Sequence, residues 1–263
     1  MSRHILITGA AGGLGLAVAD AFAAGGDRVT GADVRVEPLD AALRAIGERH
    51  GVDVAAIAAD LGAPGAHTVV DTVWDRHGPV DVLVNAAGIW PATPLLDMTE
   101  DVWDRVMTVN TRAPVMTSVA LARRAVADGR APCVVNIASG AALRARPGAA
   151  HYATSKAALE MATRSCALEF GPYGIRVNAV SPGFVRVDSA VNPITDAYAD
   201  AVSPNPLGTP GHPEDVAGAV HYLASAAARW ITGTVIRVDG GSSAGNGALP
   251  VHWSGATEIQ APG

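Results

Sequence analysis

Seven short apolar runs, separated by longer stretches of helical character, constrain the fold of this chain most strongly. The runs are rich in β-branched residues, and several are apolar at every position, as strands are when helices cover both faces of a parallel sheet. They are His4–Thr8, Arg28–Asp33, Asp53–Ala59, Val80–Asn85, Cys133–Ala138, Ile175–Val180 and Thr234–Val238. The alternation predicts repeated βαβ units, and hence an α/β fold with a doubly wound parallel sheet of seven strands.

The length and charge of the chain exclude several classes of protein. Its 263 residues fit one large α/β domain. A formal net charge of −6 argues against a nucleic-acid partner or an anionic membrane surface. No apolar run approaches the ~18 residues of a membrane span, and the first strand is too short for a signal-peptide core, so we expect a cytoplasmic protein. Cys133 and Cys166 are too few for a disulfide framework and are expected to be buried free thiols.

A glycine-rich turn, Thr8-Gly-Ala-Ala-Gly-Gly-Leu-Gly15, joins the first predicted strand to the first predicted helix. Gly9, Gly13 and Gly15 permit a tight turn and a close backbone approach, and a helix N-terminus favours negative charge. In this position between strand and helix, the turn predicts a site for the pyrophosphate of a dinucleotide, with Leu14 among the contacting residues. No metal site is predicted.

Asp33, at the end of the second predicted strand, indicates which dinucleotide is bound. A carboxylate about twenty residues after the glycine turn can accept both ribose hydroxyls and would repel a 2′-phosphate. The turn contains no Arg or Lys, and Val34 follows Asp33, so NAD is favoured over NADP. Arg35 qualifies this preference, because a loop arginine could still reach a phosphate. The alternative for Asp33 is a helix-capping or loop aspartate.

Tyr152 and Lys156 lie four residues apart, on one face of a predicted helix, and Ser139 lies thirteen residues before the tyrosine. At this spacing the ammonium stabilises the phenolate, which suits a general acid and base. Ser139 follows an apolar strand at the edge where open α/β sheets bind ligands, and its hydroxyl can hold a carbonyl or alcohol. Alone, the pair would be read as a solvated surface pair; with Ser139 and the glycine turn, it predicts hydride transfer with a nicotinamide cofactor.

Asn110 is a fourth catalytic candidate. Pro114, four residues later in a helical stretch, has no N–H to give to the carbonyl of Asn110, so that carbonyl could hold a water molecule. An ordinary helix kink is the alternative.

These residues resemble the short-chain dehydrogenase/reductase family over residues 3 to about 241. The residues that match in order are the glycine turn, Asp60-Leu61, Asn85-Ala-Ala-Gly88, Asn110, Ser139, Tyr152 with Lys156, Pro182-Gly183 and Asp239-Gly-Gly241. The resemblance implies a Rossmann-like single domain, here residues 1–241. It also implies a homo-oligomer, usually a tetramer or dimer.

The resemblance also implies site roles. Asp60 and Leu61 would flank the adenine, and Asn85, Ala86, Ala87 and Gly88 would line the cofactor. Pro182, Gly183 and Val185 would contact the nicotinamide side, Lys156 would bind the nicotinamide ribose, and Asn110 would anchor a water leading from the lysine to solvent. Val187 departs from the family, which often has Thr there to hold the carboxamide; a backbone group, Asp188 or Ser189 could compensate.

The residues that shape the substrate site are less defined by the sequence. Candidates are Trp90, Ala141, Arg144, His151 and Phe184. Trp90 could be a stacking wall or part of the core. Arg144 and Arg146 could bind an acidic substrate or stay solvated, and His151 is expected to support the site from beside Tyr152.

Two segments depart from the βα rhythm. Residues 184–212 contain several prolines around a short possible helix and are predicted to form a lid, ending at a helix start at Pro213. The tail, residues 242–263, is either disordered or docks on a neighbouring subunit through its apolar residues.

The sequence thus predicts an NAD(H)-dependent oxidoreductase that interconverts a small secondary alcohol, cyclic alcohol or polyol and its ketone. The enzyme alternative is an NADPH-dependent 3-oxoacyl thioester reductase, which would show basic residues at the glycine turn. The alternative from another class is a nucleotide-binding protein of the same fold without catalysis, in which Ser139, Tyr152 or Lys156 would typically be lost.

Overall fold

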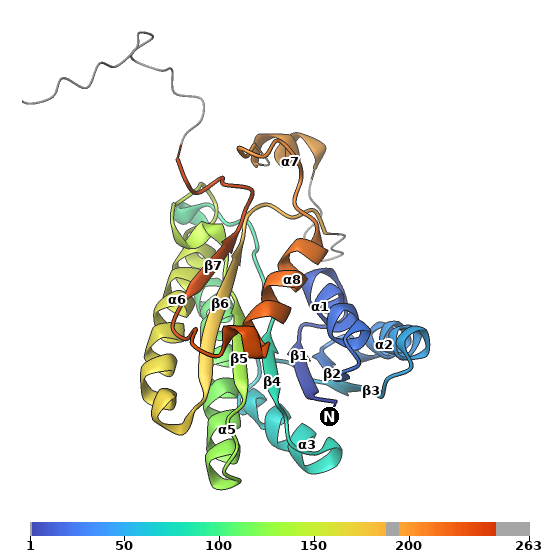
Figure 1. Cartoon of the computed structure of the whole chain (residues 1–263). Coiled ribbons are helices and arrows are strands. Elements are labelled where there is room, and N and C mark those ends of the chain that lie inside the picture. The colour runs from blue at the N-terminus through green and yellow to red at the C-terminus, as the bar shows by residue number, and fades with distance from the viewer. Residues whose placement is uncertain (1, 188–194, 203, 246–263) are drawn as a thin grey trace, which may run out of the picture.

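The computed structural model describes residues 2–187, 195–202 and 204–245. Seven parallel strands form one sheet in the order β3-β2-β1-β4-β5-β6-β7 (Figure 1). The strands are β1 (His4–Thr8), β2 (Arg28–Asp33), β3 (Val54–Ala58), β4 (Val82–Asn85), β5 (Cys133–Ile137), β6 (Arg176–Pro182) and β7 (Val235–Val238). The predicted parallel sheet is confirmed, and each predicted strand is present with its ends shifted by at most two residues.

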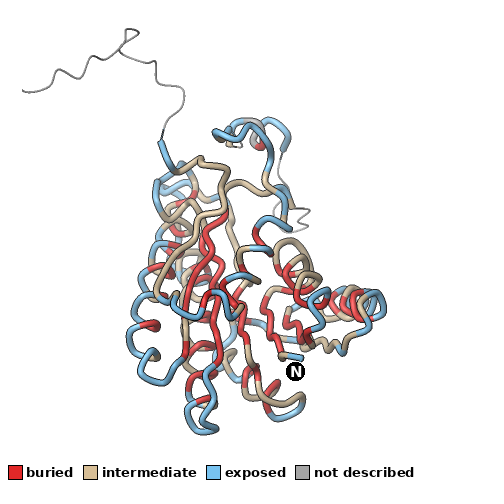
Figure 2. The backbone as a smooth tube through the Cα atoms, viewed as in Figure 1, coloured by how far each residue is buried: buried red, intermediate tan, exposed pale blue. Residues whose placement is uncertain are grey.

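Helices cover both faces of the sheet, as the apolar strands predict. On one face α1, α2 and α8 pack over a core that includes Phe22, Leu43 and Val220; on the other, α3, α5 and α6 pack over a second core that includes Trp74, Leu121 and Cys166. The helices are α1 (Gly13–Ala24), α2 (Val36–His50), α3 (Val69–His77), α4 (Glu100–Met107), α5 (Ala113–Ala127), α6 (Ala150–Phe170), α7 (Asp196–Val202) and α8 (Pro213–Leu223). Burial concentrates on the central strands between these layers (Figure 2).

The order of the strands reverses between β1 and β4, which pair directly with each other. In open parallel sheets, ligands bind in the crevice beyond the carboxyl ends of the strands at such a point. The glycine turn follows β1, and Asn85–Gly88 follows β4. The fold therefore brings two of the predicted cofactor segments together at this crevice.

The helical stretch predicted around Asn110 changes pitch in its middle. A π-helical turn, Thr108–Arg112, joins α4 to α5 without a break. Pro114 lies just beyond this turn and lacks the N–H of a regular α-helical ladder, which accounts for the wider turn at this place. The helical stretch around Asn110 is as predicted, but the π turn is not recognisable from the sequence.

The predicted helix start at Pro213 is confirmed: His212 N donates a hydrogen bond to the Asp215 carboxylate (2.8 Å), which closes the first turn of α8. Val185 pairs with Gly211, so the two ends of the predicted lid lie together. Residues 188–194 and 203 of that segment, and most of the predicted tail, lie outside the described residues. Within the described ranges, no helix combines the length and apolar character needed to cross a membrane.

Candidate active site

The glycine turn packs directly against the loop that follows β4. A β-carbon on Gly9 would stand 2.6 Å from the Ala87 Cα, and one on Gly15 would stand 2.2 Å from the Gly9 carbonyl oxygen. Gly9 and Gly13 also have φ values of 69° and 54°, which favour glycine. Gly9 and Gly15 are therefore required by close packing, while Leu14 faces the core under α1.

The N-terminus of α1 lacks a side-chain cap. Its N-cap is Gly12, which makes no side-chain hydrogen bond, so the first backbone N–H groups of α1 are open to an anionic ligand. Arg35 and Val187 flank the turn. A β-carbon on Gly12 would lie 3.6 Å from an Arg35 guanidinium nitrogen, and a β-carbon on Gly13 would lie 3.6 Å from the Val187 Cβ. A glycine cradle with open N–H groups fits the pyrophosphate of a dinucleotide.

Asp33 lies at the end of β2 beside this turn, as predicted. Its carboxylate accepts hydrogen bonds from Ala11 N (3.1 Å) and Arg35 N (3.0 Å), and the Arg35 Nε lies 3.7 Å away. The backbone bonds fix the carboxylate against the turn and leave its remaining lone pairs for hydroxyl donors.

The Asn110 side chain joins the π turn to two other segments. Its Oδ1 accepts from Ile89 N (2.9 Å), and its Nδ2 donates to Ile89 O (2.8 Å) and to Ser155 Oγ (3.1 Å). Asn110 is fully buried, so these bonds are shielded from water. They fix the backbone just after Gly88 relative to α6.

Lys156 reaches from α6 toward the sheet. Its Nζ donates to the Ile137 carbonyl (2.7 Å) at the end of β5 and lies 5.9 Å from the centre of the Tyr152 ring. Burial lowers the pKa of the Lys156 ammonium to about 8. The same ammonium lies 3.6 Å from the position of a β-carbon on Gly88, so Gly88 and the lysine are neighbours in van der Waals contact range.

Ser139 lies two residues beyond β5, at the same edge of the sheet. Its Oγ accepts a hydrogen bond from Ala141 N (3.2 Å), which begins a short 3₁₀ turn over Gly140–Ala142. Accepting this bond orients the hydroxyl, and its own proton remains available to a ligand oxygen.

Three predicted cofactor residues have side chains directed into the protein interior or toward neighbouring loops. Asn85 donates to Asn136 Oδ1 (2.9 Å) and accepts from Thr117 Oγ1 (2.9 Å), within a buried network between β4, β5 and α5. Leu61 packs in the core with α3, and Asp60 accepts from Gly62 N (2.8 Å) and pairs with Arg105 (3.3 Å). Backbone atoms of Ala86 and Ala87 pack against Gly9, whereas Gly88 lies beside the Asn110 and Lys156 side chains.

The end of β6 lies against the end of β7. Gly183 N donates to Val238 O (2.9 Å), and a β-carbon on Gly183 would stand 2.8 Å from Asp239 Cα. Pro182 is therefore the last strand position, and Val185 and Val187 continue toward the glycine turn. Asp188 and Ser189, which could compensate for Val187, lie outside the described residues.

The predicted substrate residues occupy different environments. Trp90, Ala141 and Phe184 are half-buried on loops at the carboxyl edge. The Arg144 guanidinium donates to the Ser242 carbonyl (2.9 Å) and thus holds the C-terminal segment.

His151 is fully buried at the start of α6, and neither ring nitrogen has a hydrogen-bond partner among the described residues. Burial lowers the pKa of this imidazole below its usual value, which favours the neutral form.

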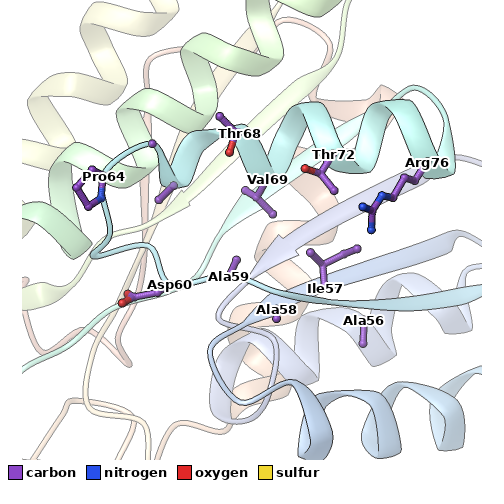
Figure 3. A pocket seen from close by; sticks show the side chains of 12 residues that line it. Ala56, Ile57, Ala58, Ala59, Asp60, Pro64, Thr68, Val69, Thr72 and Arg76 are labelled. Carbon is purple, nitrogen blue, oxygen red and sulfur yellow. The ribbon is translucent and has the colours of Figure 1, made fainter.

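A separate cavity of about 490 Å³ lies between β3 and α3 (Figure 3). It is lined by Ile57, Val69, Thr72 and Arg76, and it borders the predicted adenine loop only through Asp60. Its lining contains none of the four predicted catalytic residues. No group of metal-ligating side chains is found within the described ranges.

Sequence reasoning missed Ser155. Its Oγ accepts a hydrogen bond from Asn110 Nδ2 and donates one to the Tyr152 carbonyl (2.7 Å). Ser155 therefore connects the π turn to the backbone of Tyr152. The available signal was a serine just before Lys156 in the helix, but its partner could not be identified without the fold.

Comparison with known proteins gives strong matches. A family model described as enoyl-(acyl carrier protein) reductase matches residues 9–243. The L-rhamnose 1-dehydrogenase (NAD(P)(+)) of Azotobacter vinelandii is 36% identical, with 92% of this chain and 96% of that protein covered. A galactitol 2-dehydrogenase of Cereibacter sphaeroides is 34% identical, covering 89% and 92%. A 3-oxoacyl-[acyl-carrier-protein] reductase of Thermotoga maritima is 35% identical, covering 90% and 96%.

Solved structures agree with this fold. The acetoin dehydrogenase of Salmonella typhimurium superposes with a TM-score of 0.85 at 28% identity, with 95% of this chain and 99% of that chain covered. A 4-hydroxyisoleucine dehydrogenase complexed with NADH gives a TM-score of 0.81 at 33% identity, covering 93% and 100%.

We expect His151→Leu to reduce the acid sensitivity of the fold. Below about pH 6.5 the unfolded chain binds a proton at this imidazole more readily than the folded protein does. The free energy of unfolding therefore decreases as the pH is lowered, by up to about 1.4 kcal/mol per pH unit for each such group. The free energy of unfolding in urea at about pH 7.5 and about pH 5.5 should fall less in the variant. His4 is also buried with a lowered pKa, so part of the fall remains. An equal decrease of the free energy of unfolding in both proteins would contradict a lowered pKa of His151 in the folded state.

Proposed function

Because this chain belongs to the short-chain dehydrogenase/reductase family, we propose that it interconverts a small secondary alcohol or polyol and its ketone with NAD(H). The observation that carries the proposal is the buried Lys156 ammonium, which lies 5.9 Å from the centre of the Tyr152 ring and 3.6 Å from the position of a β-carbon on Gly88. The names of the rhamnose, galactitol and acetoin dehydrogenases among the similar proteins support alcohol oxidation as the chemistry.

The residues of the site have separate roles in binding, orientation and proton transfer. When bound, the nicotinamide takes a hydride from the alcohol carbon or returns it to the ketone. Ser139 holds the substrate oxygen, and Tyr152 accepts or donates its proton. Lys156 supplies positive charge that stabilises the phenolate and binds the nicotinamide ribose. Asn110 positions Lys156 and Tyr152 through Ser155 and the backbone after Gly88.

The proposed preference for NAD rests on Asp33. Its carboxylate is fixed at the turn, where it would accept ribose hydroxyls and repel a 2′-phosphate. Arg35 lies against Gly12 and pairs with Asp33, so its charge is partly compensated in this position.

We also propose a cytoplasmic homo-oligomer, a tetramer or dimer. Support comes from exposed apolar side chains along α6, where Leu168 is 80% and Met161 59% exposed. Such side chains on one helix suit burial against a second copy of the chain.

Tyr152→Phe is expected to lower kcat by about 10² to 10⁴-fold and to leave NADH binding within about twofold, because the phenol oxygen transfers the proton while the ring is retained. Turnover is measured by NADH absorbance with a panel of secondary alcohols, polyols and a 3-oxoacyl thioester. Tyr173→Phe, on an exposed turn after α6, is the matched control. Full activity of Tyr152→Phe would refute the mechanism, and turnover of only the thioester would favour the reductase alternative.

Asp33→Ser should shift cofactor preference toward NADP⁺ by about tenfold in the ratio of dissociation constants, since repulsion of the 2′-phosphate is removed while Arg35 remains. Titration calorimetry with NAD⁺ and NADP⁺ measures this, with Asp40→Ser on the outer side of α2 as the control. Preference of the unaltered protein for NADP⁺ would overturn the assignment of Asp33.

Light scattering of the purified protein should give the mass of a dimer or tetramer. Leu168→Glu is expected to weaken that assembly, because a carboxylate would replace an apolar contact. A monomeric mass for the unaltered chain would refute the proposed assembly.

A further inference from the structure

A charged pair beneath α6 belongs neither to the glycine cradle nor to the proton-transfer residues. The Glu160 side chain on α6 is 7% exposed, and its carboxylate accepts a hydrogen bond from Arg237 Nη1 on β7 (3.5 Å). No other hydrogen bond to this carboxylate is found among the described residues. Because a buried carboxylate is costly without a compensating charge, Glu160 depends on Arg237 for its place in the fold.

The same nitrogen of Arg237 also binds β6. Nη1 donates to Ser181 Oγ (3.1 Å), and Ser181, which is fully buried, is the register partner of Arg237 across the two strands. Ile236 and Val238, on either side of Arg237, pack against the core under α8. Since side chains alternate between the two faces of a strand, Arg237 extends over the opposite face, where α6 lies. One guanidinium group thus links α6, β6 and β7.

Glu160 lies on the face of α6 that carries the proposed proton-transfer residues. Tyr152, Lys156 and Glu160 follow one another at intervals of four residues, and side chains at this spacing lie one above the other on a helix. Lys156 Nζ donates to the Ile137 carbonyl at the end of β5. This face of α6 is therefore attached to the sheet at two successive turns, to β5 through Lys156 and to β6 and β7 through Arg237 (Figure 1).

The strand that Arg237 binds continues directly into a predicted cofactor segment. Ser181 is followed by Pro182 and Gly183, which are predicted to contact the nicotinamide side. Gly183 N donates to the Val238 carbonyl (2.9 Å), so β6 and β7 stay joined up to this segment. A displacement of α6 relative to β6 would therefore also displace the proton-transfer face relative to the nicotinamide segment.

We propose that Arg237 is a positioning residue, which acts through Glu160 and fixes the proton-transfer face of α6 relative to the segment that begins at Pro182. The structural link is independent of the proposed function, whereas its effect on catalysis rests on that function. Hydride and proton transfer require both segments to hold their geometry at once, and a displacement of about 1 Å can cost about 10²-fold in rate. Loss of Arg237 is therefore expected to lower kcat more than it changes binding.

Arg237→Leu should lower kcat for the best alcohol about tenfold and leave KM and the NADH dissociation constant within about twofold. Arg3→Leu is the matched control, because the Arg3 and Asp27 side chains are 31% and 7% exposed, against 29% and 7% for Arg237 and Glu160. Arg3 lies just before β1, at the amino edge of the sheet. Both substitutions leave a buried carboxylate unpaired, but only Arg237→Leu should lower kcat. An unchanged kcat, or an equal loss in both variants, would overturn the proposal.

Substitutions of Glu160 separate position from charge. Glu160→Gln keeps an acceptor for Arg237 Nη1, so kcat should stay within about twofold, whereas Glu160→Leu should lower kcat about tenfold. The double variant that combines Glu160→Leu with Arg237→Leu should be no worse than either single variant, because each removes the same link. It leaves neither charge of the pair buried and unpaired, so it tests the proposal even if Arg237→Leu does not fold. Additive losses of kcat would overturn the proposal.

Hydrogen exchange tests the structural link without reference to activity. The double variant should accelerate amide exchange in α6 between Tyr152 and Glu160 about tenfold relative to exchange in α2, because loss of the link favours local opening of α6. Arg3→Leu should leave this ratio unchanged. Equal ratios in the unaltered protein and the double variant would overturn the link. If the unaltered protein turns over no alcohol while the double variant accelerates exchange in α6, the proposed function fails and the structural link stands.

Discussion

The side-chain amide of Asn110 is the interaction on which the candidate site depends. It holds the N–H and carbonyl of Ile89 after β4 and the hydroxyl of Ser155 on α6. These bonds are buried, and an amide has both the donor and the acceptor that a backbone segment needs. This one side chain thereby joins three segments: the loop after β4, the π turn and α6.

The π turn explains why this asparagine can make such contacts. A wider turn rotates the residues around it relative to a regular helix, and π turns are frequent at functional sites. Thr111 Oγ1 also donates to the Ser155 carbonyl (2.9 Å), so two successive residues of the turn bind the same position of α6. The π turn therefore places two neighbouring side chains, Asn110 and Thr111, so that both bind Ser155.

Burial sets the chemistry of Lys156. An ammonium removed from water is stabilised here by the Ile137 carbonyl, and its pKa falls to about 8. The same burial places the charge within reach of Tyr152 and Gly88 rather than of solvent. A lysine at this position on an exposed helix would be screened and would have little influence on a neighbouring phenol.

The sequence by itself determined the sheet, the glycine turn, and the places of Asp33, Ser139, Tyr152 and Lys156. These follow from local rules: strand periodicity, the need for glycine in a tight turn, and spacing along one helix. Only the tertiary structure decided that Asn85 faces an interior network, that Ser155 links Asn110 to α6, and that Arg144 holds the C-terminal segment. Those facts depend on which side chains meet across segments distant in the chain, and hydrogen-bond partners of that kind leave no periodic signal in the sequence.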